Sequence, residues 1–426
     1  MPDNISALVH AGTLRIPPMS DSATLSAPEL PAHRMTVPER RATQSLAAIF
    51  ALRMLGLFLV LPVFMLEAAR YPGGDDPALI GLAMGIYGLT QAVMQVPLGL
   101  ASDRIGRKKV IVWGLVVFAL GSVAAALAGS VHMLVVGRAL QGAGAVSAAV
   151  TALLADLTRD IVRTKAMAAV GISIAGMFAL SLVAAPPLAG AIHLSGLFWL
   201  TALLAIGGIL VVLRWTPDEP RRHADQPLGR LQDVWLHPHL WRLDLGVFVL
   251  HTVQMAMWVV VPELLVQAGL VKARHWQLYL PAVLASFVMM GGLFALERRG
   301  YLRAVLRAGI ALLLLVQFAL MLIAPNAPGL WTLGWVMFFF FVAFNLIEAS
   351  QPSLISRLAP ANARGAALGV YNTLQSLGLF AGGALGGWLF KLGGPAAVLS
   401  GTSVLVALWL LLGWAQPMPE TLRPRA

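Results

Sequence analysis

Long apolar stretches separated by short polar connections dominate the chain from residue 43 onward. Each stretch is about 20 residues or longer, the length that an α-helix needs to cross the hydrocarbon core of a bilayer. The apolar–polar alternation of membrane β-barrel strands is absent from the sequence. Because a lipid-exposed chain must satisfy its own backbone hydrogen bonds, we expect helices throughout. The pattern predicts twelve spans, at roughly 43–69, 78–101, 110–130, 133–155, 166–190, 195–214, 243–266, 277–297, 304–324, 329–356, 365–390 and 395–415.

Polar segments divide these spans into two groups of six. Residues 1–42 are rich in Pro and Ser and lack the apolar core of a signal peptide, so we expect a disordered tail, with Met35 as an alternative start of the chain. Residues 215–242 contain several prolines and predict a linker. The expected organisation is a disordered tail, a helical bundle, a linker, a second bundle and a short tail, at 1–42, 43–214, 215–242, 243–415 and 416–426.

Composition agrees with an all-α polytopic membrane protein. Hydrophobic residues make up 58% of the chain and charged residues 12%, with a mean hydropathy of +0.80, whereas soluble domains carry about 25% charged residues. The chain has no cysteine and only scattered histidines, so we expect no metal site. It also lacks a Gly-rich phosphate loop and any nucleophile–base spacing, so we expect neither an ATP-driven pump nor an enzyme, and no cofactor beyond a proton gradient.

The basic residues predict the orientation in the membrane. Of the 30 Lys and Arg residues, 24 lie in the connections on the same side as both termini, and four lie on the other side. The positive-inside rule therefore places both termini in the cytoplasm of a multi-pass inner-membrane protein. The net charge of +11 thus follows from topology, and we expect no nucleic-acid partner.

The two groups of spans repeat a short motif. The sequence Asp-Arg-Ile-Gly at 103–106 follows the second span, and Glu-Arg-Arg-Gly at 297–300 follows the eighth. Matched turns at equivalent places in two groups of six predict duplicated halves.

The first of these turns lies within a longer pattern, Gly-x-x-x-Asp-Arg-x-Gly-Arg-Lys-Lys at 99–109. Topology explains its four basic residues, but not why Gly99, Asp103 and Gly106 stand among them. Glycines permit a sharp turn and close helix packing, and an acid among bases suggests a specific partner. The pattern resembles motif A of the major facilitator superfamily.

Other segments resemble one branch of that superfamily, the proton-coupled drug antiporters. The fourth span carries a match to motif B of these antiporters, formed by Arg138, Gln141, Gly142 and Gly144. The chain from about 36 to 415 is most similar to the YajR-type subgroup. Two features depart from these relatives. The motif C pattern Gly-Pro-x-x-Gly-Gly is replaced by Ala-Pro-Pro-Leu-Ala-Gly at 185–190, and the C-terminal soluble domain of the subgroup is not expected in a chain that runs to Ala426.

The resemblance implies a fold and a gate. It implies two six-helix bundles related by a pseudo-two-fold axis, with a substrate cavity between them that opens alternately to each side. It further implies that Asp103 caps the N-terminus of the eleventh helix in the outward-open state. Arg104 and Arg107 would then contact the acid at the end of the fourth span, Asp156.

Polar residues within the spans are candidates for the transport site. A charge at mid-bilayer costs about 2.5–3.5 kcal/mol or more, so we expect each charged residue there to have a structural or functional role. Arg53, Glu348, His251 and Gln254 fall near the middle of their predicted spans, and Arg138 lies nearer the outer third of the fourth. Because they come from different helices at compatible depths, we expect a shared central cavity.

Each candidate has a functional and a structural interpretation. Glu348 is a candidate proton carrier, or alternatively a static ion-pair partner. Arg53 keeps its charge at any relevant pH, so it is a candidate counter-ion rather than a carrier. Arg138 takes a role in proton coupling from the motif B resemblance, whereas a lone histidine such as His251 is more often structural. Three charged residues lie at the outer ends of their predicted helices, where we expect water at the membrane interface to solvate them: Glu67, Glu263 and Lys391.

The sequence favours a secondary active transporter that works by alternating access. The first hypothesis is proton-driven efflux of small amphipathic or cationic compounds. The second is proton symport of a nutrient or metabolite, which the departure from motif C keeps open. The third is a membrane receptor without transport. Protons, a small-molecule substrate and the lipid bilayer are the expected partners of a monomeric protein.

Overall fold

Helices account for the regular structure of the described residues. The computed structural model describes residues 34–219, 240–296, 299, 301–326, 328–359 and 364–414. The helices belong to one compact unit that begins at Met35. The expected tail at 1–33, most of the expected linker, most of the second repeat turn and the residues from 415 onward lie outside the described residues. The all-α fold class predicted from the sequence is confirmed.

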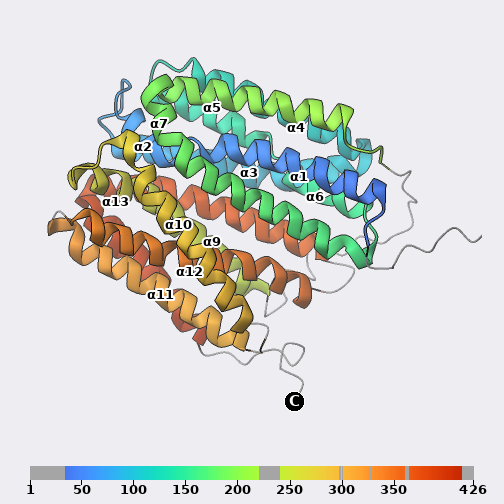
Figure 1. Cartoon of the computed structure of the whole chain (residues 1–426). Helices are drawn as coiled ribbons and strands as arrows, with labels where there is room; N and C mark the ends of the chain where they lie inside the picture. The colour runs from blue at the N-terminus through green and yellow to red at the C-terminus, as the bar shows by residue number, and fades with distance from the viewer. Residues whose placement is uncertain are drawn as a thin grey trace, which may run out of the picture. The chain divides into compact units, whose positions relative to one another are not determined.

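The first half of the chain contains seven helices within the described residues. They are α1 (Val37–Phe58), α2 (Leu61–Ala68), α3 (Pro77–Ile105), α4 (Arg107–Ala126), α5 (Val131–Ala143), α6 (Ser147–Asp156) and α7 (Asp160–Arg214). The second half contains α9 (Leu240–Gln267), η1 (Lys272–Arg274), α10 (Trp276–Leu296), α11 (Leu302–Ile323), η3 (Ala324–Asn326), α12 (Leu330–Leu358) and α13 (Arg364–Trp414). We call these the N-terminal half and the C-terminal half, and Figure 1 shows them as the blue-to-green and yellow-to-red groups of helices.

The described helices form ten segments that are long and apolar enough to cross a membrane. Two of them have 54 and 47 residues, although about 20 residues suffice for one crossing. Both break near their middle. α7 departs from helical geometry at His193, with φ of 58°, and α13 departs at Gly393 and Gly394. If each is divided at its break, the described helices correspond to the twelve predicted spans.

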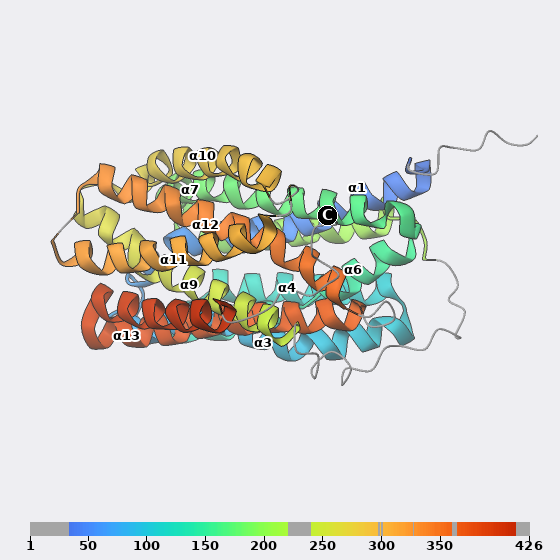
Figure 2. The same ribbon diagram turned by 90° about the horizontal axis from the view of Figure 1, so that it is seen from below.

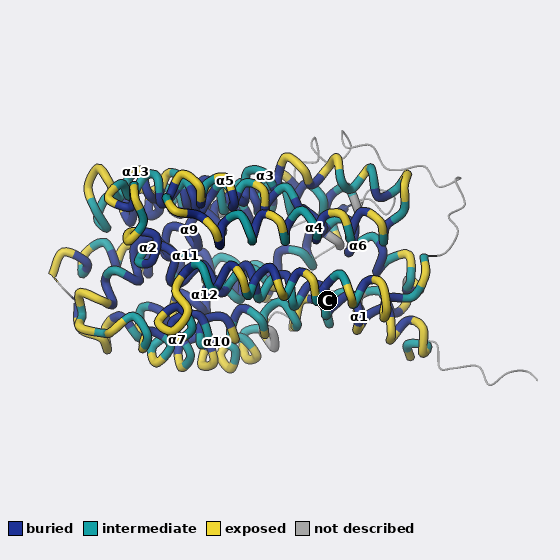
Figure 3. The backbone as a smooth tube through the Cα atoms, turned by 90° about the horizontal axis from the view of Figure 1, so that it is seen from above, coloured by how far each residue is buried: buried dark blue, intermediate teal, exposed yellow. Residues whose placement is uncertain are grey.

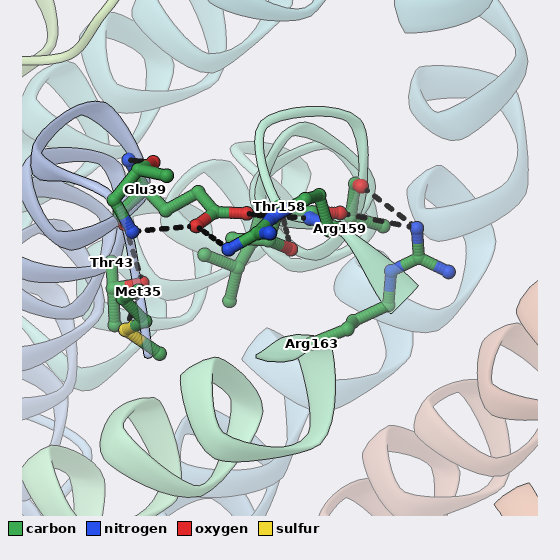
Figure 4. A network of polar contacts seen from close by, with 9 residues as sticks. Met35, Glu39, Thr43, Thr158, Arg159 and Arg163 are labelled. Carbon is green, nitrogen blue, oxygen red and sulfur yellow. Dashed lines mark hydrogen bonds and ion pairs between the residues drawn. The ribbon is translucent and has the colours of Figure 1, made fainter. Parts of the chain in front are cut away.

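α1 begins before the predicted first span. Thr36 and Glu39 form a capping box, in which the Glu39 amide donates to Thr36 Oγ1 (3.3 Å) and the Thr36 amide donates to Glu39 Oε2 (2.8 Å). The helix therefore starts at Val37, so the expected disordered tail cannot extend to residue 42. The Arg159 side chain also donates to Glu39, at 2.8 and 3.0 Å, and thereby links the start of α1 to the α6–α7 connection (Figure 4).

Glycines bring the two halves into close contact. α13 runs beside α3 (Figure 2). A Cβ atom on Gly85 of α3 would lie 2.6 Å from the Phe380 carbonyl oxygen, and one on Gly383 would lie 2.7 Å from the Gly85 amide nitrogen. Real Cβ atoms essentially never approach so closely, so this contact requires glycine on both helices. Since α3 starts and the first part of α13 ends at the predicted outer side, the halves pack together there.

α9 is buried among the other helices. In its apolar window 89% of the residues are buried, against 22% in the window that contains α10, and Figure 3 shows α9 mainly in dark blue. Gly378 and Gly382 of α13 pack against the backbone of α9 at Phe248 and Thr252. The polar residues of α9 therefore face protein rather than lipid.

Candidate transport site

Arg53 lies in a cage of neutral partners inside the N-terminal half. Its side chain is on α1, and the residue is 1% exposed. The guanidinium donates to Ser147 Oγ at 3.1 Å, to the Tyr87 hydroxyl at 2.7 Å and to Gln91 Oε1 at 3.3 Å. Its carbon also lies 5.6 Å from the centre of the Phe118 ring. These contacts hold the charge in one place.

Arg138 on α5 is bound in the same way on the other side of Tyr87. It is fully buried and donates to Gln141 Oε1 (2.9 Å) and to the Met84 carbonyl (3.3 Å). Its guanidinium carbon lies 5.0 Å from the Tyr87 ring centre and 5.9 Å from that of Phe64. Cations are attracted to aromatic faces, more strongly where water is excluded. Tyr87 thus contacts both arginines, one through its hydroxyl and one through its ring.

The motif B residues build this site. The Gln141 side-chain nitrogen donates to Ser122 Oγ at 2.8 Å. This bond leaves the Gln141 side-chain oxygen oriented toward the Arg138 guanidinium. A Cβ atom on Gly142 would collide with the Tyr87 backbone, and one on Gly144 would lie 2.8 Å from the Phe118 amide nitrogen. The two glycines therefore let α5 approach the helices that carry the partners of both arginines.

Neither arginine forms an ion pair with an acid among the described residues. Hydrogen-bond acceptors and aromatic rings are their partners. Because an arginine stays protonated, the N-terminal half holds two permanent positive charges.

The C-terminal half holds a different cluster, formed by Glu348, His251 and Gln375. They lie on α12, α9 and α13. The Gln375 amide nitrogen donates to Glu348 Oε1 at 3.1 Å and lies 2.8 Å from His251 Nε2. His251 Nε2 is also 3.5 Å from Glu348 Oε2. Three helices therefore meet at one carboxylate.

Hydrogen bonding assigns a neutral form to His251. Its Nδ1 lies 3.0 Å from the Val247 carbonyl, an oxygen that can only accept. Nδ1 therefore carries the proton, which leaves Nε2 to accept from the Gln375 amide. The Glu348 side chain is 33% exposed, but its Oε2 atom is buried and has no hydrogen-bond partner. Part of the side chain thus borders an accessible space, while the carboxylate oxygens face protein.

The structure separates candidates that the sequence placed together. We expected Arg53, Arg138, Glu348, His251 and Gln254 to share one cavity. Among the described contacts no hydrogen bond or ion pair joins the arginines to Glu348, because their side chains face partners within their own half. Gln254 is buried on α9 at 5% exposure and makes no hydrogen bond to His251 or Glu348 in the described residues.

Aromatic rings join the two halves beside this cluster. Phe178 of α7 lies 5.2 Å from Phe58 of α1, measured between ring centres. It also lies 6.4 Å from Trp258 of α9 and 6.5 Å from Phe344 of α12. Phe344 in turn is 5.8 Å from the His251 ring. The polar cluster of the C-terminal half is thus bordered by an apolar, aromatic surface to which both halves contribute.

Motif A forms a network at the other end of the N-terminal half. Arg107 pairs with Asp103 at 2.6 Å and with Asp156 at 3.2 Å, and it donates to Ser102 Oγ at 2.7 Å. Arg104 is exposed and pairs with no acid among the described residues. Of the two arginines expected to contact Asp156 in the outward-open state, Arg107 does so in this structure and Arg104 makes no described contact with it. The expectation for Arg104 stays a prediction.

The glycines of motif A differ in their importance. Gly106 has a φ of 107°, a backbone conformation that favours glycine, and it lets the Glu219 carboxylate accept from the Arg107 amide at 2.7 Å. A Cβ on Gly99 would meet Ala148 at 3.6 Å, an ordinary contact. The expected cap of the α13 N-terminus by Asp103 stays a prediction.

Known proteins resemble the chain along most of its length. The profile of the Major Facilitator Superfamily matches residues 46–383. This chain belongs to the Major Facilitator Superfamily. It is 42% identical over 393 residues to the inner membrane transport protein YajR of Escherichia coli, which covers 91% of this chain and 86% of YajR. It is 26% identical over 381 residues to multidrug resistance protein 2 of Bacillus subtilis, which covers 85% and 92%.

Solved structures of this superfamily share the fold. The D-xylose-proton symporter superposes with a TM-score of 0.73 at 17% identity, covering 89% of this chain and 98% of the symporter. Superfamily members are membrane transporters rather than enzymes, so the expectations of a membrane transporter without enzymatic activity are confirmed. The orientation of the termini stays a prediction.

Ion pairs across the two halves went unnoticed in the sequence. Lys272 pairs with Glu67 at 2.7 Å, and Lys391 pairs with Asp76 at 2.8 Å. In each pair the acid belongs to the N-terminal half and the lysine to the C-terminal half. Glu67 is only 4% exposed, so its assignment to interfacial solvation was wrong, whereas the Lys391 side chain is 52% exposed.

Tyr87 and Gln375 are the central residues that sequence reasoning missed. A neutral polar side chain in an apolar helix carries no charge that demands an explanation. Their positions on polar helix faces were nevertheless visible: Tyr87 stands four residues before Gln91 and Tyr371 four before Gln375, and residues at this spacing share one face of a helix.

Proposed function

We propose that this superfamily transporter exports small amphipathic or cationic compounds in exchange for protons. The observation that supports this most strongly is the cluster of Glu348, His251 and Gln375, which places the carboxylate of a partly exposed side chain among three helices. A carboxylate can bind a proton or attract a cation, but one negative charge cannot serve both at once. Competition for Glu348 therefore couples the two movements.

The N-terminal half supports this assignment by its permanent charge. Arg53 and Arg138 cannot release protons under physiological conditions. They repel a cationic substrate from the N-terminal half and leave the acid of the C-terminal half as its electrostatic partner. The aromatic cluster around Phe178, which is buried in this structure, offers rings that attract cations as well as apolar groups. The similarity to a multidrug resistance protein agrees with efflux.

Alternating access supplies the movement between the two sides. The contact of Gly85 with Gly383 and the two ion pairs close the halves on the predicted outer side. An inward-facing state of this kind is the one in which an exporter collects its substrate from the cytoplasm. Protonation of Glu348 from the outside would release the substrate there and allow the return.

A proton symporter is the second candidate, favoured by the altered motif C. Ala185 and Ala189 of α7 stand where the antiporter pattern has glycines, whereas Pro186 matches its proline. A symporter would carry its substrate and the proton inward together on the same acid.

Inside-out vesicles distinguish these candidates. With an acidified lumen, wild type should release protons when ethidium or tetraphenylphosphonium is added, and Glu348→Gln should abolish this release. Glu263→Gln is the matched control, since Glu263 bonds only to Gln267 at the outer end of α9 among the described contacts. A wild type that is silent toward a broad panel of cations contradicts efflux, and proton-driven uptake of a metabolite in cells would establish symport.

A further inference from the structure

The three helices around Glu348 carry a second polar layer. The first layer is formed by His251, Glu348 and Gln375. The second layer takes one residue from each of the same helices: Asp244 from α9, Gln351 from α12 and Tyr371 from α13. We refer to them as the Glu348 layer and the Asp244 layer.

Helical spacing aligns the two layers. Asp244 stands seven residues before His251, Gln351 three residues after Glu348, and Tyr371 four residues before Gln375. Residues at spacings of three, four and seven lie on one face of an α-helix. Each helix therefore presents both of its polar residues on one face.

The Asp244 layer is displaced in the same direction on all three helices. α9 begins at Leu240, α12 ends at Leu358 and α13 begins at Arg364. Asp244, Gln351 and Tyr371 are each closer to these termini than their partners in the Glu348 layer. This end of the bundle is the predicted cytoplasmic end. The Asp244 layer therefore lies between Glu348 and the cytoplasm.

A direct contact joins two members of the second layer. The Tyr371 hydroxyl donates to Gln351 Oε1 at 3.4 Å, and both residues are buried, at 2% and 3% exposure. A Cβ atom on Gly246 would lie 2.6 Å from Gln351 Nε2, so the Gln351 amide packs against the backbone of α9 at this level.

Asp244 itself has no partner that would fix a negative charge. It is 6% exposed, and its Oδ1 atom has no hydrogen-bond partner. No ion pair connects it to a described cation. A buried carboxyl without a cation beside it carries a proton at less cost than a charge.

The surroundings of Asp244 contain few other charged or titratable groups. Tyr371 faces it from α13, and α12 contributes the neutral Gln351 at this level. On α9, His251 is two turns away, and Arg242 lies over the Trp241 ring at 5.4 Å. α2 and η1 contact α9 at its other end, where Glu67 pairs with Lys272.

We propose that Asp244 is a second proton-binding site, between Glu348 and the cytoplasm. Asp244 rests protonated and first releases its proton to the cytoplasm. The resulting carboxylate then takes up the proton that leaves Glu348: the O–H bond at Glu348 breaks, one at Asp244 forms, and the negative charge moves from Asp244 to Glu348. Asp244 is thereby protonated again, and one proton has entered the cytoplasm. This inference rests on the proposed role of Glu348.

Infrared difference spectroscopy can detect each carboxyl separately and without substrate. Spectra of the purified protein in lipid would be compared between acid and alkaline pH, after labelling with ¹³C-aspartate or ¹³C-glutamate. We expect one aspartate-sensitive and one glutamate-sensitive band from buried protonated carboxyls. Asp244→Asn should remove the first, Glu348→Gln should remove the second, and the control Asp75→Asn, at an exposed position, should remove neither.

The outcomes separate this inference from the proposed function. If Asp244→Asn leaves the aspartate band unchanged, or wild type has no such band, the inference is overturned while the role of Glu348 stands. If the glutamate band survives Glu348→Gln, the proposed function loses its proton site.

Tyr371→Phe tests the layer without removing a carboxyl. The ring remains and only the hydroxyl is lost, so both bands should persist. Because that hydroxyl donates to Gln351 within the Asp244 layer, the pH at which the aspartate band appears should shift relative to wild type. Substrate-triggered proton release should also slow severalfold. An aspartate band that titrates as in wild type contradicts the arrangement even if Asp244→Asn fails to fold.

Discussion

The two halves of this transporter bury their polar groups in different ways. In the N-terminal half, Arg53 and Arg138 are bound on either side of Tyr87 by neutral acceptors and rings. In the C-terminal half, Glu348 and His251 meet at the Gln375 amide, and both can change their protonation state. One half therefore holds a constant field, whereas the other holds groups that respond to pH.

This difference assigns separate tasks to halves that share one architecture. A duplicated bundle does not require duplicated chemistry, because function resides in particular side chains rather than in the fold. Changes around the arginines should act on stability and on every transport mode. Changes around Glu348 should act mainly on the pH dependence of transport.

The largest effect is expected from Arg138→Lys. An ammonium group keeps the charge but cannot donate to Gln141 and the Met84 carbonyl in the geometry of a guanidinium fork. Losing one hydrogen bond to a charged group costs about 1.5–3 kcal/mol, so the thermal unfolding midpoint in detergent should fall. Arg242→Lys is the control, because Arg242 lies over the half-exposed Trp241. If Arg138→Lys unfolds at the same temperature as wild type, the positive charge alone matters at this position.

Gln375→Leu should alter pH dependence rather than stability. It removes the amide that donates to Glu348 and contacts His251. A hydrogen bond from a neutral amide affects a carboxylate and a carboxylic acid differently, so the pH at which substrate drives half-maximal proton release should shift relative to wild type. Gln254→Leu is the matched control, since Gln254 makes no bond to the cluster. If both variants behave alike in vesicle assays, the amide does not serve the carboxylate.

Lys272→Met should loosen the outer contact between the halves. It leaves the Glu67 carboxylate buried, with a side chain only 5% exposed and with Arg70 at 3.5 Å as its remaining described ion-pair partner. The chain has no cysteine, so a single cysteine at Val259, which is fully buried in α9, can report opening. Maleimide applied from outside should label it severalfold faster in Lys272→Met. If the labelling rate is the same as in the protein with Lys272, this ion pair does not hold the outer side closed.

The smallest effect should come from the pair of Lys391 with Asp76. The lysine ammonium, followed by the hydrogen bond from the Ala78 amide, lowers the pKa of Asp76 below its ordinary value of 3.8. Because the pKa is depressed by the pair, its contribution is complete above pH 3.8 and is lost as the pH falls through the lowered value. The thermal unfolding midpoint in detergent should thus fall slightly as the pH drops through this value. Lys391→Met should remove the share of that fall due to the pair, and the half-exposed lysine predicts a small amplitude.

Sequence reasoning reached the charged members of each site but not the residues that connect them. The cost of a charge in the membrane identified Arg53, Arg138 and Glu348. No comparable cost attends Tyr87 or Gln375, so only their helical spacing from Gln91 and Tyr371 pointed to them.

A similar limit applies at the two ends of the bundle. Motif A revealed that Asp156 meets an arginine, but the choice of Arg107 over Arg104 depends on which way each side chain leaves the turn at Gly106. Glu67 appeared to be solvated because it stands at a helix end, yet it is buried by a lysine more than 200 residues away.

The sequence by itself determined the membrane-spanning architecture, the division into two halves and the superfamily. These properties follow from the lengths of apolar segments and from local motifs, which act through neighbouring residues. The tertiary structure alone decided which polar groups meet. A helix can rotate about its axis without changing its sequence, and only packing against other helices selects the face that Asp244, Glu348 or Gln375 presents.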